Sequence, residues 1–156
     1  HTTARRQRQM CIRDSMNNGK IHQIDTPINL LNNPKTIFVS SFILGNNIIN
    51  LKKNGNSYIS CLGEINCSEY LKNTGIKSMS ISPKFISIKR SESGDAIVIS
   101  KEFLGEFLIY KVSINGNILR VRTDINNLLN NGDKCSLSIN KNSYYFLYPG
   151  AHKVYI

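Results

Sequence analysis

Long hydrophobic runs, clustered metal ligands and acidic residues are all scarce in this chain of 156 residues. No apolar run approaches the roughly 18 residues that suggest a membrane span, so we expect none. Acidic residues number 10 against 20 basic ones, which leaves few carboxylates for acid and base catalysis. The length suits one domain with a real core, or a small domain joined to the remnant of another.

Cysteines are few and scattered. Besides Cys11, the chain holds Cys61, Cys67 and Cys135, with no C-x-x-C pair and no histidine cluster beside them. This spacing predicts no zinc site. Unclustered thiols fit a reducing cytoplasm, where each serves as a small buried apolar residue.

Motifs for nucleotide binding and nucleophilic catalysis are also absent. Gly19-Lys20 is followed by Ile21 and lacks the upstream glycine of a phosphate loop, and neither G-x-G-x-x-G nor G-x-S-x-G occurs. Glu102 and Glu106 flank a predicted strand bend, where carboxylates are more often solvated than catalytic. We therefore predict no catalytic residue, no cofactor-binding residue and no metal ligand in this chain.

Residues 1–15 differ in composition from the rest. They hold four of the seven arginines and no lysine, whereas lysine supplies most of the positive charge elsewhere. We interpret them as a non-native basic segment that resembles translated sequencing-adapter read-through, and expect that Met16 is not the native start. The alternative, a basic arm or a targeting peptide, lacks the apolar stretch or amphipathic repeat that would support it.

Without that segment the formal charge falls from +10 to +7. The remaining lysines are dispersed, as on an ordinary solvated surface. A nucleic-acid groove needs clustered cations with interleaved aromatic residues, and only Lys111, Arg120 and Arg122 come close. We therefore expect no nucleic-acid partner.

Two short helices are predicted near the start. Thr26 can cap a helix that begins at Pro27 and ends at Asn33 before Pro34. The next run, residues 35–44, has apolar residues spaced by three and four, which gives one apolar helical face, and Gly45 ends it.

The rest of the chain is predicted to be mainly β. Runs rich in Ile, Val, Tyr and Phe predict eight strands, at residues 57–63, 76–82, 84–90, 95–105, 106–114, 117–123, 134–140 and 143–149. Short strands at this spacing suggest a small sandwich or barrel, with the five-stranded OB type as a natural candidate.

The clearest local signal is a hairpin around Asn115-Gly116, a turn pair that tolerates positive φ. Alternation along its first strand predicts one buried face, and the partner strand adds to the same face. The residues of this predicted face are Leu108, Tyr110, Val112, Ile114, Leu119 and Val121.

A family resemblance rests on the opening motifs. Residues 19–27, GKIHQIDTP, followed by Pro34, residues 38–43 (FVSSFI) and residues 45–47, resemble the end of the nucleotide-binding domain of ABC importer ATPases. That family has the pattern G-[KR]-I-x-Q-x-G-T-P, then P-x-x-x-F-V-A-x-F-I-G-x-x-N. The departures are Asp25 for glycine, Ser40 for alanine and one extra residue, Leu44. None of them removes a chemical group that the motif needs.

The later residues are similar to the TOBE-type, OB-like domain that follows this ATPase. Residues 78–84 match its hydrophobic-x-[IV]-R-P-E strand and turn, with Ser82 for arginine and Lys84 for glutamate. Residues 102–105 resemble its x-F-L-G turn, and residues 131–138 its penultimate strand. The resemblance divides the chain into residues 16–48, a remnant of the nucleotide-binding domain whose main part lies outside this chain, and residues 49–156, an OB-like regulatory domain.

The resemblance implies an accessory, regulatory and dimerisation domain of an ABC import ATPase, with ferric iron as the leading guess for the solute. Its partners would be permease subunits and a second copy, on the cytoplasmic face of the plasma membrane, and ATP and Mg would bind the parent chain only. Polyamine, sulfate, molybdate and sugar importers share this architecture. The alternative is a stand-alone OB-fold module that binds nucleic acid or a small oxyanion.

Overall fold

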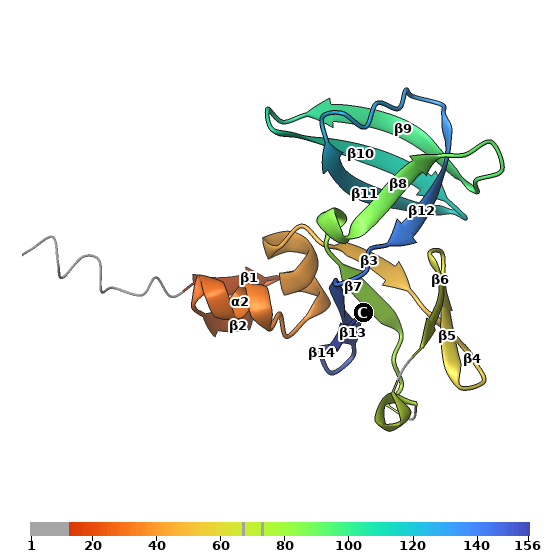
Figure 1. Cartoon of the computed structure of the whole chain (residues 1–156). Coiled ribbons are helices and arrows are strands. Elements are labelled where there is room, and N and C mark those ends of the chain that lie inside the picture. The colour runs from red at the N-terminus through yellow and green to blue at the C-terminus, as the bar shows by residue number, and fades with distance from the viewer. Residues whose placement is uncertain (1–12, 67, 73) are drawn as a thin grey trace, which may run out of the picture.

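The computed structural model describes residues 13–66, 68–72 and 74–156, and it is mainly β, as the sequence predicts. Fourteen strands within these residues form four sheets, and each of the eight predicted segments contains a strand. Figure 1 shows two β units stacked one above the other, with the N-terminal elements beside the lower unit. No helix in the described part of the chain is long and apolar enough to cross a membrane.

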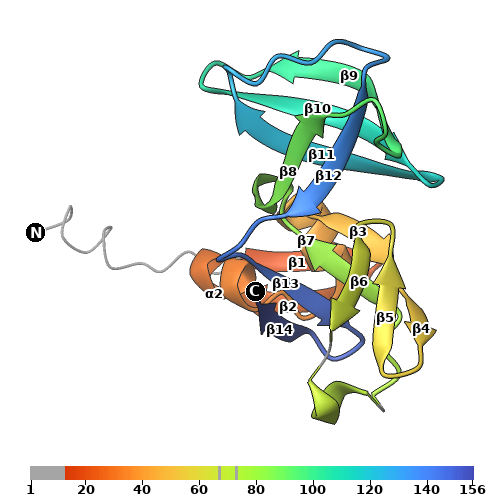
Figure 2. The same cartoon turned by 45° about the vertical axis from the view of Figure 1, so that its right-hand side comes forward.

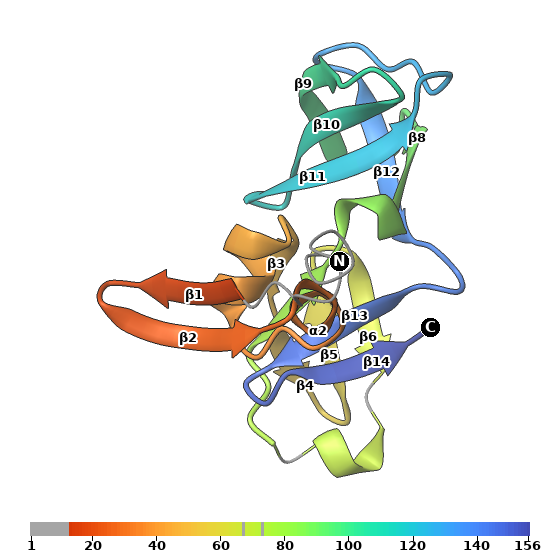
Figure 3. The ribbon, with the colours of Figure 1, turned by 90° about the vertical axis from the view of Figure 1, so that its left-hand side faces the viewer.

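The first element is a hairpin of β1 (Arg13–Asn17) and β2 (Lys20–Asp25), which projects sideways from the sheets in Figure 3. Residues 13–15, which we assigned to the non-native segment, are therefore paired, and Ser15 is buried. An exposed strand edge accepts any extended neighbour, so this pairing does not reveal the segment's origin. Residues 1–12 lie outside the described residues, and the foreign origin stays a prediction.

Helix α2 (Pro27–Asn32) forms as predicted, because the Thr26 side chain accepts a hydrogen bond from the Asn29 backbone N–H and Pro27 occupies the first turn. The second helical run differs from the prediction. It contains a π-helix, η1 (Val39–Ile43), and the residues that it buries are Val39 and Ser40 rather than the expected apolar face. The wider π turn shifts the inward face, and Phe42 points to solvent.

The lower unit combines two sheets. The larger has the order β14-β13-β7-β3, and the smaller has the order β4-β5-β6. These strands are β3 (Asn47–Asn50), β4 (Lys52–Asn54), β5 (Ser57–Ser60), β6 (Gly63–Asn66), β7 (Ser78–Ile81), β13 (Tyr144–Tyr148) and β14 (His152–Tyr155). A short 3-10 helix, η2 (Glu69–Leu71), lies between β6 and β7. The predicted domain boundary after residue 48 falls inside β3 and stays a prediction.

The larger sheet is covered on both faces. Ile49, Met79 and Leu147 lie in register across three strands and belong to the same buried cluster as Tyr58 and Ile65 of the smaller sheet. On the other face Ser80 hydrogen-bonds the Ser40 side chain of η1. Small serine side chains at this contact let the helix approach the sheet closely.

The upper unit is a five-stranded sheet with the order β11-β10-β9-β12-β8, seen curling over itself in Figure 2. Its strands are β8 (Ile86–Arg90), β9 (Ala96–Phe103), β10 (Phe107–Ile114), β11 (Asn117–Asp124) and β12 (Lys134–Ile139). This architecture is consistent with the OB-like domain that the sequence predicts.

The central hairpin of this unit confirms the predicted register. Val112 faces Leu119 and Tyr110 faces Val121 across β10 and β11, and all six residues of the predicted face are buried. Asn115 and Gly116 both have positive φ, at 46° and 78°. Ile109 is buried as well, although its alternating position predicted an outward side chain.

The five-stranded unit is inserted between two paired strands of the lower unit. Ile81 of β7 lies opposite Tyr145 of β13, and the chain leaves through the 3-10 helix η3 (Pro83–Phe85) and returns through Asn140. The Asn140 backbone N–H donates to the Phe85 carbonyl at 2.8 Å, and its side-chain amide donates to the Lys84 carbonyl at 3.2 Å. The two crossings therefore lie side by side.

Candidate functional site

The residues of the opening motif have structural tasks. Gln23 is buried, its amide nitrogen donates to the Asn33 carbonyl at 3.1 Å, and its oxygen accepts the Lys35 backbone N–H at 3.0 Å. It thus pins the end of α2 to β2. Asp25 accepts hydrogen bonds from the Asn29 side chain and the Thr26 backbone N–H, and these bonds lower the pKa of its carboxyl.

A set of large apolar side chains is exposed on the N-terminal elements. We call it the N-terminal apolar set; its members are Met16, Ile21, Ile24, Ile28, Leu31, Phe42 and Ile43. Ile28 is 69% and Phe42 is 75% exposed. Ile37 is exposed as well, whereas Phe38 is half-buried because its ring lies between those of His22 and Phe42. Exposed apolar side chains on neighbouring elements make this end of the chain a candidate interaction surface.

A polar cleft of about 670 Å³ opens on the five-stranded unit. Lys84 and Ser87 line it from the β8 side, and Glu106, Arg122 and Asp124 line it from the side of β10 and β11. The Arg122 guanidinium lies 3.8 Å from the centre of the Phe107 ring, so one face of this ring is covered by a cation. The sequence did not reveal the cleft, because its lining comes from segments far apart in the chain.

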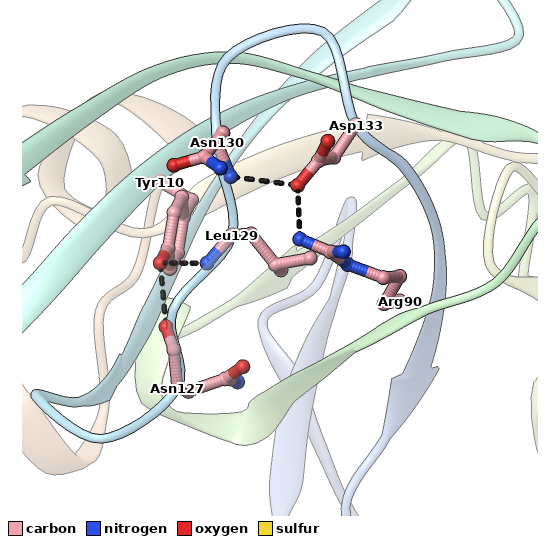
Figure 4. Close-up of polar contacts among 6 residues, drawn as sticks. All are labelled: Arg90, Tyr110, Asn127, Leu129, Asn130 and Asp133. Carbon is pink, nitrogen blue, oxygen red and sulfur yellow. Dashed lines mark hydrogen bonds and ion pairs between the residues drawn. The ribbon is translucent and has the colours of Figure 1, made fainter.

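A buried tyrosine holds the long loop behind this cleft. Figure 4 shows that the Tyr110 hydroxyl donates to the Asn127 carbonyl at 2.5 Å and accepts the Leu129 backbone N–H at 2.9 Å. Asp133 accepts from the Asn130 backbone N–H and from the Arg90 guanidinium, each at 2.7 Å. These bonds fix residues 127–133, which have no regular secondary structure.

An amide side chain bridges the two β units. Asn47 of β3 is buried, its side-chain nitrogen donates to the Arg120 carbonyl, and its oxygen accepts the Arg120 backbone N–H, both at 2.8 Å. The asparagine thus pairs with the β11 backbone as a neighbouring strand would.

The cations singled out in the sequence come together only in part. Lys111 and Arg120 are cross-strand neighbours, while Arg122 lies opposite Ile109. Glu102 lies beside Lys111 and Arg120 in a shallow hollow on this face, so the cluster carries mixed charge. Glu102 and Glu106 lie on different hollows and form no carboxylate pair.

Within the described residues, no group of three or more histidine, cysteine, aspartate or glutamate side chains is placed to hold a metal. Burial raises the pKa of the thiols of Cys61 and Cys135, which makes them poor nucleophiles at neutral pH. Cys67 and Cys11 lie outside the described residues. The predicted lack of catalytic, cofactor-binding and metal-binding residues stays a prediction.

Comparison with known proteins gives matches that cover only part of this chain. Over 44 residues, which are 28% of this chain, the sequence is 52% identical to the spermidine/putrescine import ATP-binding protein PotA of Bacillus thuringiensis (strain Al Hakam). This part of the chain is homologous to an import ATP-binding protein. Proteins of the same name from Bacillus cereus and Bacillus anthracis match to the same extent.

The matched residues make up 12% of the length of these relatives. No family model matches the chain, so the TOBE-type assignment stays a prediction. The relatives are named as polyamine import proteins, and nothing in the comparison supports ferric iron as the solute.

Proposed function

We propose that this chain is the carboxyl-terminal region of the ATP-binding subunit of an ABC-type importer. Residues 16–48 complete its nucleotide-binding domain, and the two β units form an accessory and regulatory module. The 52% identity to a polyamine import ATP-binding protein carries this proposal. The subunit acts on the cytoplasmic face of the membrane, bound to permease subunits.

The N-terminal apolar set supports the proposal. Side chains such as Ile28 and Phe42 are costly to leave in water, since burial stabilises a large aliphatic or aromatic side chain by roughly 1.5–3 kcal/mol. The body of a nucleotide-binding domain packed on α2 and η1 would cover them. That body supplies the phosphate loop and the magnesium ligands, so ATP and Mg bind the parent subunit and not this chain.

The β units then serve as the contact between two copies of the subunit. A contact that persists while the nucleotide interface opens keeps the two ATPase domains at high effective concentration, so that reclosure is intramolecular. The solute is chosen by the permease and its binding protein. Because the relatives are named for spermidine and putrescine, we propose a polyamine rather than ferric iron.

A chimera tests the proposal. Residues 16–156 replace the corresponding carboxyl-terminal region of the Bacillus anthracis relative, and the chimera is expressed in a strain that lacks this relative. We expect ATP hydrolysis by the purified transporter and uptake of labelled spermidine. F42D should abolish both, because it places a carboxylate in the domain contact, whereas I118D, at an equally exposed position of β11, should leave ATP hydrolysis intact. The proposal would be contradicted if the chimera with neither substitution assembled with the permease but showed no ATP hydrolysis and no spermidine uptake.

The OB-module alternative receives little support. Lys111 and Arg120 adjoin each other, but Glu102 shares their hollow and Arg122 already covers one face of the Phe107 ring. Binding of single-stranded nucleic acid in the micromolar range at physiological salt, in preference to heparin, would favour that alternative.

A further inference from the structure

Asparagine is followed directly by glycine at four turns of this chain. The pairs are Asn18-Gly19, Asn54-Gly55, Asn115-Gly116 and Asn131-Gly132, and each of the four asparagines is exposed. Asparagine is a thermolabile residue, because the backbone nitrogen of the next residue can attack its side-chain carbonyl carbon. Glycine has no side chain to shield that nitrogen. A β-carbon added at any of these glycines would meet no atom within 4 Å beyond its chain neighbours, so the space around them is open.

The hydrogen bonding of the glycine N–H separates one pair from the other three. Gly132 donates its backbone N–H to the Val98 carbonyl at 2.8 Å. The backbone N–H groups of the other three glycines make no hydrogen bond within the part of the chain that the structure describes. A bonded N–H gives up its proton less readily, and its nitrogen is held in place. Asn131 is therefore shielded from attack by its own glycine.

The loop around Asn131 is also held on both sides. The Asp133 carboxylate accepts the Asn130 backbone N–H at 2.7 Å, and the Asp133 backbone N–H donates to the Asn130 carbonyl at 3.0 Å. The Leu129 backbone N–H is held by the Tyr110 hydroxyl at 2.9 Å. Although this loop has no regular secondary structure, its hydrogen bonds keep the Asn131 side chain from moving onto the glycine nitrogen.

The other three pairs lie at the tips of hairpins. They join β1 to β2, β4 to β5 and β10 to β11. The tip of a hairpin opens locally at a small cost in free energy, because few hydrogen bonds hold it. Each opening lets the side-chain carbonyl carbon of the asparagine approach the unbonded glycine nitrogen.

We propose that Asn18, Asn54 and Asn115 are sites of spontaneous deamidation and that Asn131 is protected. The glycine backbone nitrogen loses its proton to water and forms a bond to the side-chain carbonyl carbon. The bond from this carbon to the side-chain nitrogen breaks, and that nitrogen leaves as ammonia with a proton taken from water. Water then opens the five-membered imide at either of its carbonyls, which gives aspartate or isoaspartate. The net reaction consumes one water and releases one ammonia, without an oxidant, and it does not depend on the proposed function.

Deamidation at Asn115 changes the best-defined hairpin of the upper unit. Asn115 and Gly116 form a two-residue turn that sets the pairing of β10 with β11. Aspartate adds a negative charge at this turn, and isoaspartate also adds a methylene group to the backbone. The modification therefore acts on the two strands that carry the buried face of this unit.

Incubation of the whole chain at pH 8, followed by peptide mass spectrometry, tests the proposal. Trypsin places the four pairs on four different peptides, which are residues 14–20, 54–72, 112–120 and 123–134. We expect Asn115 to be converted at least fivefold faster than Asn131 in the folded chain, with Asn18 and Asn54 also faster than Asn131. In urea, where the hydrogen bonds of the loop are lost, the four rates should agree within about threefold.

Two variants test whether the loop's hydrogen bonds protect Asn131. D133A removes the carboxylate that holds the Asn130 N–H, so it should speed the conversion of Asn131 at least threefold and change that of Asn115 less than twofold. D95A removes an exposed carboxylate just before β9 and should leave both rates unchanged. Circular dichroism of D133A checks that the variant is folded. If it is not, Y110F, which frees the Leu129 N–H of the same loop, takes its place with the same expectation.

Conversion of Asn131 as fast as Asn115 in the folded chain would overturn the proposal. So would four folded-state rates in the same proportions as in urea, because the structure would then have no influence. An absence of aspartate and isoaspartate at all three hairpin tips, over a time in which the urea-unfolded chain is converted, would overturn it as well.

Discussion

At the scale of single residues, a few buried side chains decide the fold of each unit. Val112 is fully buried between its cross-strand neighbours Leu119 and Val98, whereas the adjacent Lys111 is exposed. Tyr110 and Tyr148 combine a buried ring with a hydroxyl that bonds a distant backbone segment. Each of these three residues gives a prediction.

Replacing Val112 with alanine should lower the free energy of unfolding by about 1–3 kcal/mol, because buried methyl groups are lost and a gap remains. K111A, one position away on the exposed face, is the matched control and should change it by less than about 0.5 kcal/mol. Guanidinium unfolding followed by circular dichroism measures both. Equal effects of the two substitutions would mean that the register is wrong.

The Y110F substitution should lower the free energy of unfolding by about 1–3 kcal/mol, because the Leu129 N–H and the Asn127 carbonyl are left without their hydrogen-bond partner. Hydrogen exchange should accelerate at residues 127–133 more than in β10 itself. Y155F removes a hydroxyl from an exposed tyrosine and should leave exchange in this loop unchanged. Slow exchange at the loop in Y110F would show that other contacts hold it.

Burial raises the pKa of Tyr148 from 10.0 to about 12. The folded state therefore holds this proton more tightly than the unfolded state does. Its contribution to stability is complete below pH 10 and is lost as the pH rises toward about 12. Y148F also loses the bond to the Pro34 carbonyl, so it should be less stable at pH 8, but its stability should fall less steeply over this alkaline range. If the stability of Y148F and of the unaltered protein fell equally steeply with pH over this range, Tyr148 would not be the group that titrates.

At the scale of elements, the second helical run shows that packing can override the structure that sequence periodicity predicts. The 3-and-4 spacing of residues 35–44 predicted one apolar helical face, but the chain forms the π-helix η1 and turns Phe42 outward. Exposed apolar residues of α2 and η1 should make the isolated chain self-associate.

I28D/F42D should reduce this self-association without lowering stability, because both side chains are already largely in water. I97D/I118D is the matched control, with two exposed isoleucines replaced on the five-stranded unit. Light scattering across a concentration series and thermal unfolding measure the two properties. If I97D/I118D reduced self-association more than I28D/F42D, the association surface would lie on the five-stranded sheet instead.

The elements also show which features a sequence reveals. The eight longer β segments were predictable, because alternation and turn residues are local, and the Asn115-Gly116 hairpin followed from φ preferences alone. The short strands β3, β4 and β14 were not predicted, because the residues around them do not extend their pattern as those around β5 and β7 do. The cleft near Arg122 could not be predicted, because it joins segments that only tertiary pairing brings together.

At the scale of the whole molecule, we expect this chain to lack the nucleotide chemistry of its proposed parent. The sequence holds no phosphate loop, so the purified chain should hydrolyse no ATP, and Mg-ATP should leave its melting temperature unchanged. A full-length subunit of the Bacillus relative is the positive control. A concentration-dependent rise in melting temperature with Mg-ATP would reveal a nucleotide site in this chain.

The adjoining crossings at Phe85 and Asn140 make the five-stranded unit a separable insertion. Because the chain leaves β7 and returns to β13 at neighbouring points of one ladder, a short turn could replace everything between them and leave the lower unit's pairing intact. The upper unit can therefore be exchanged as a whole. A single recombination event could lengthen, exchange or delete this unit, and under the proposed function it would change the regulation of the transporter without altering the contact with the ATPase domain.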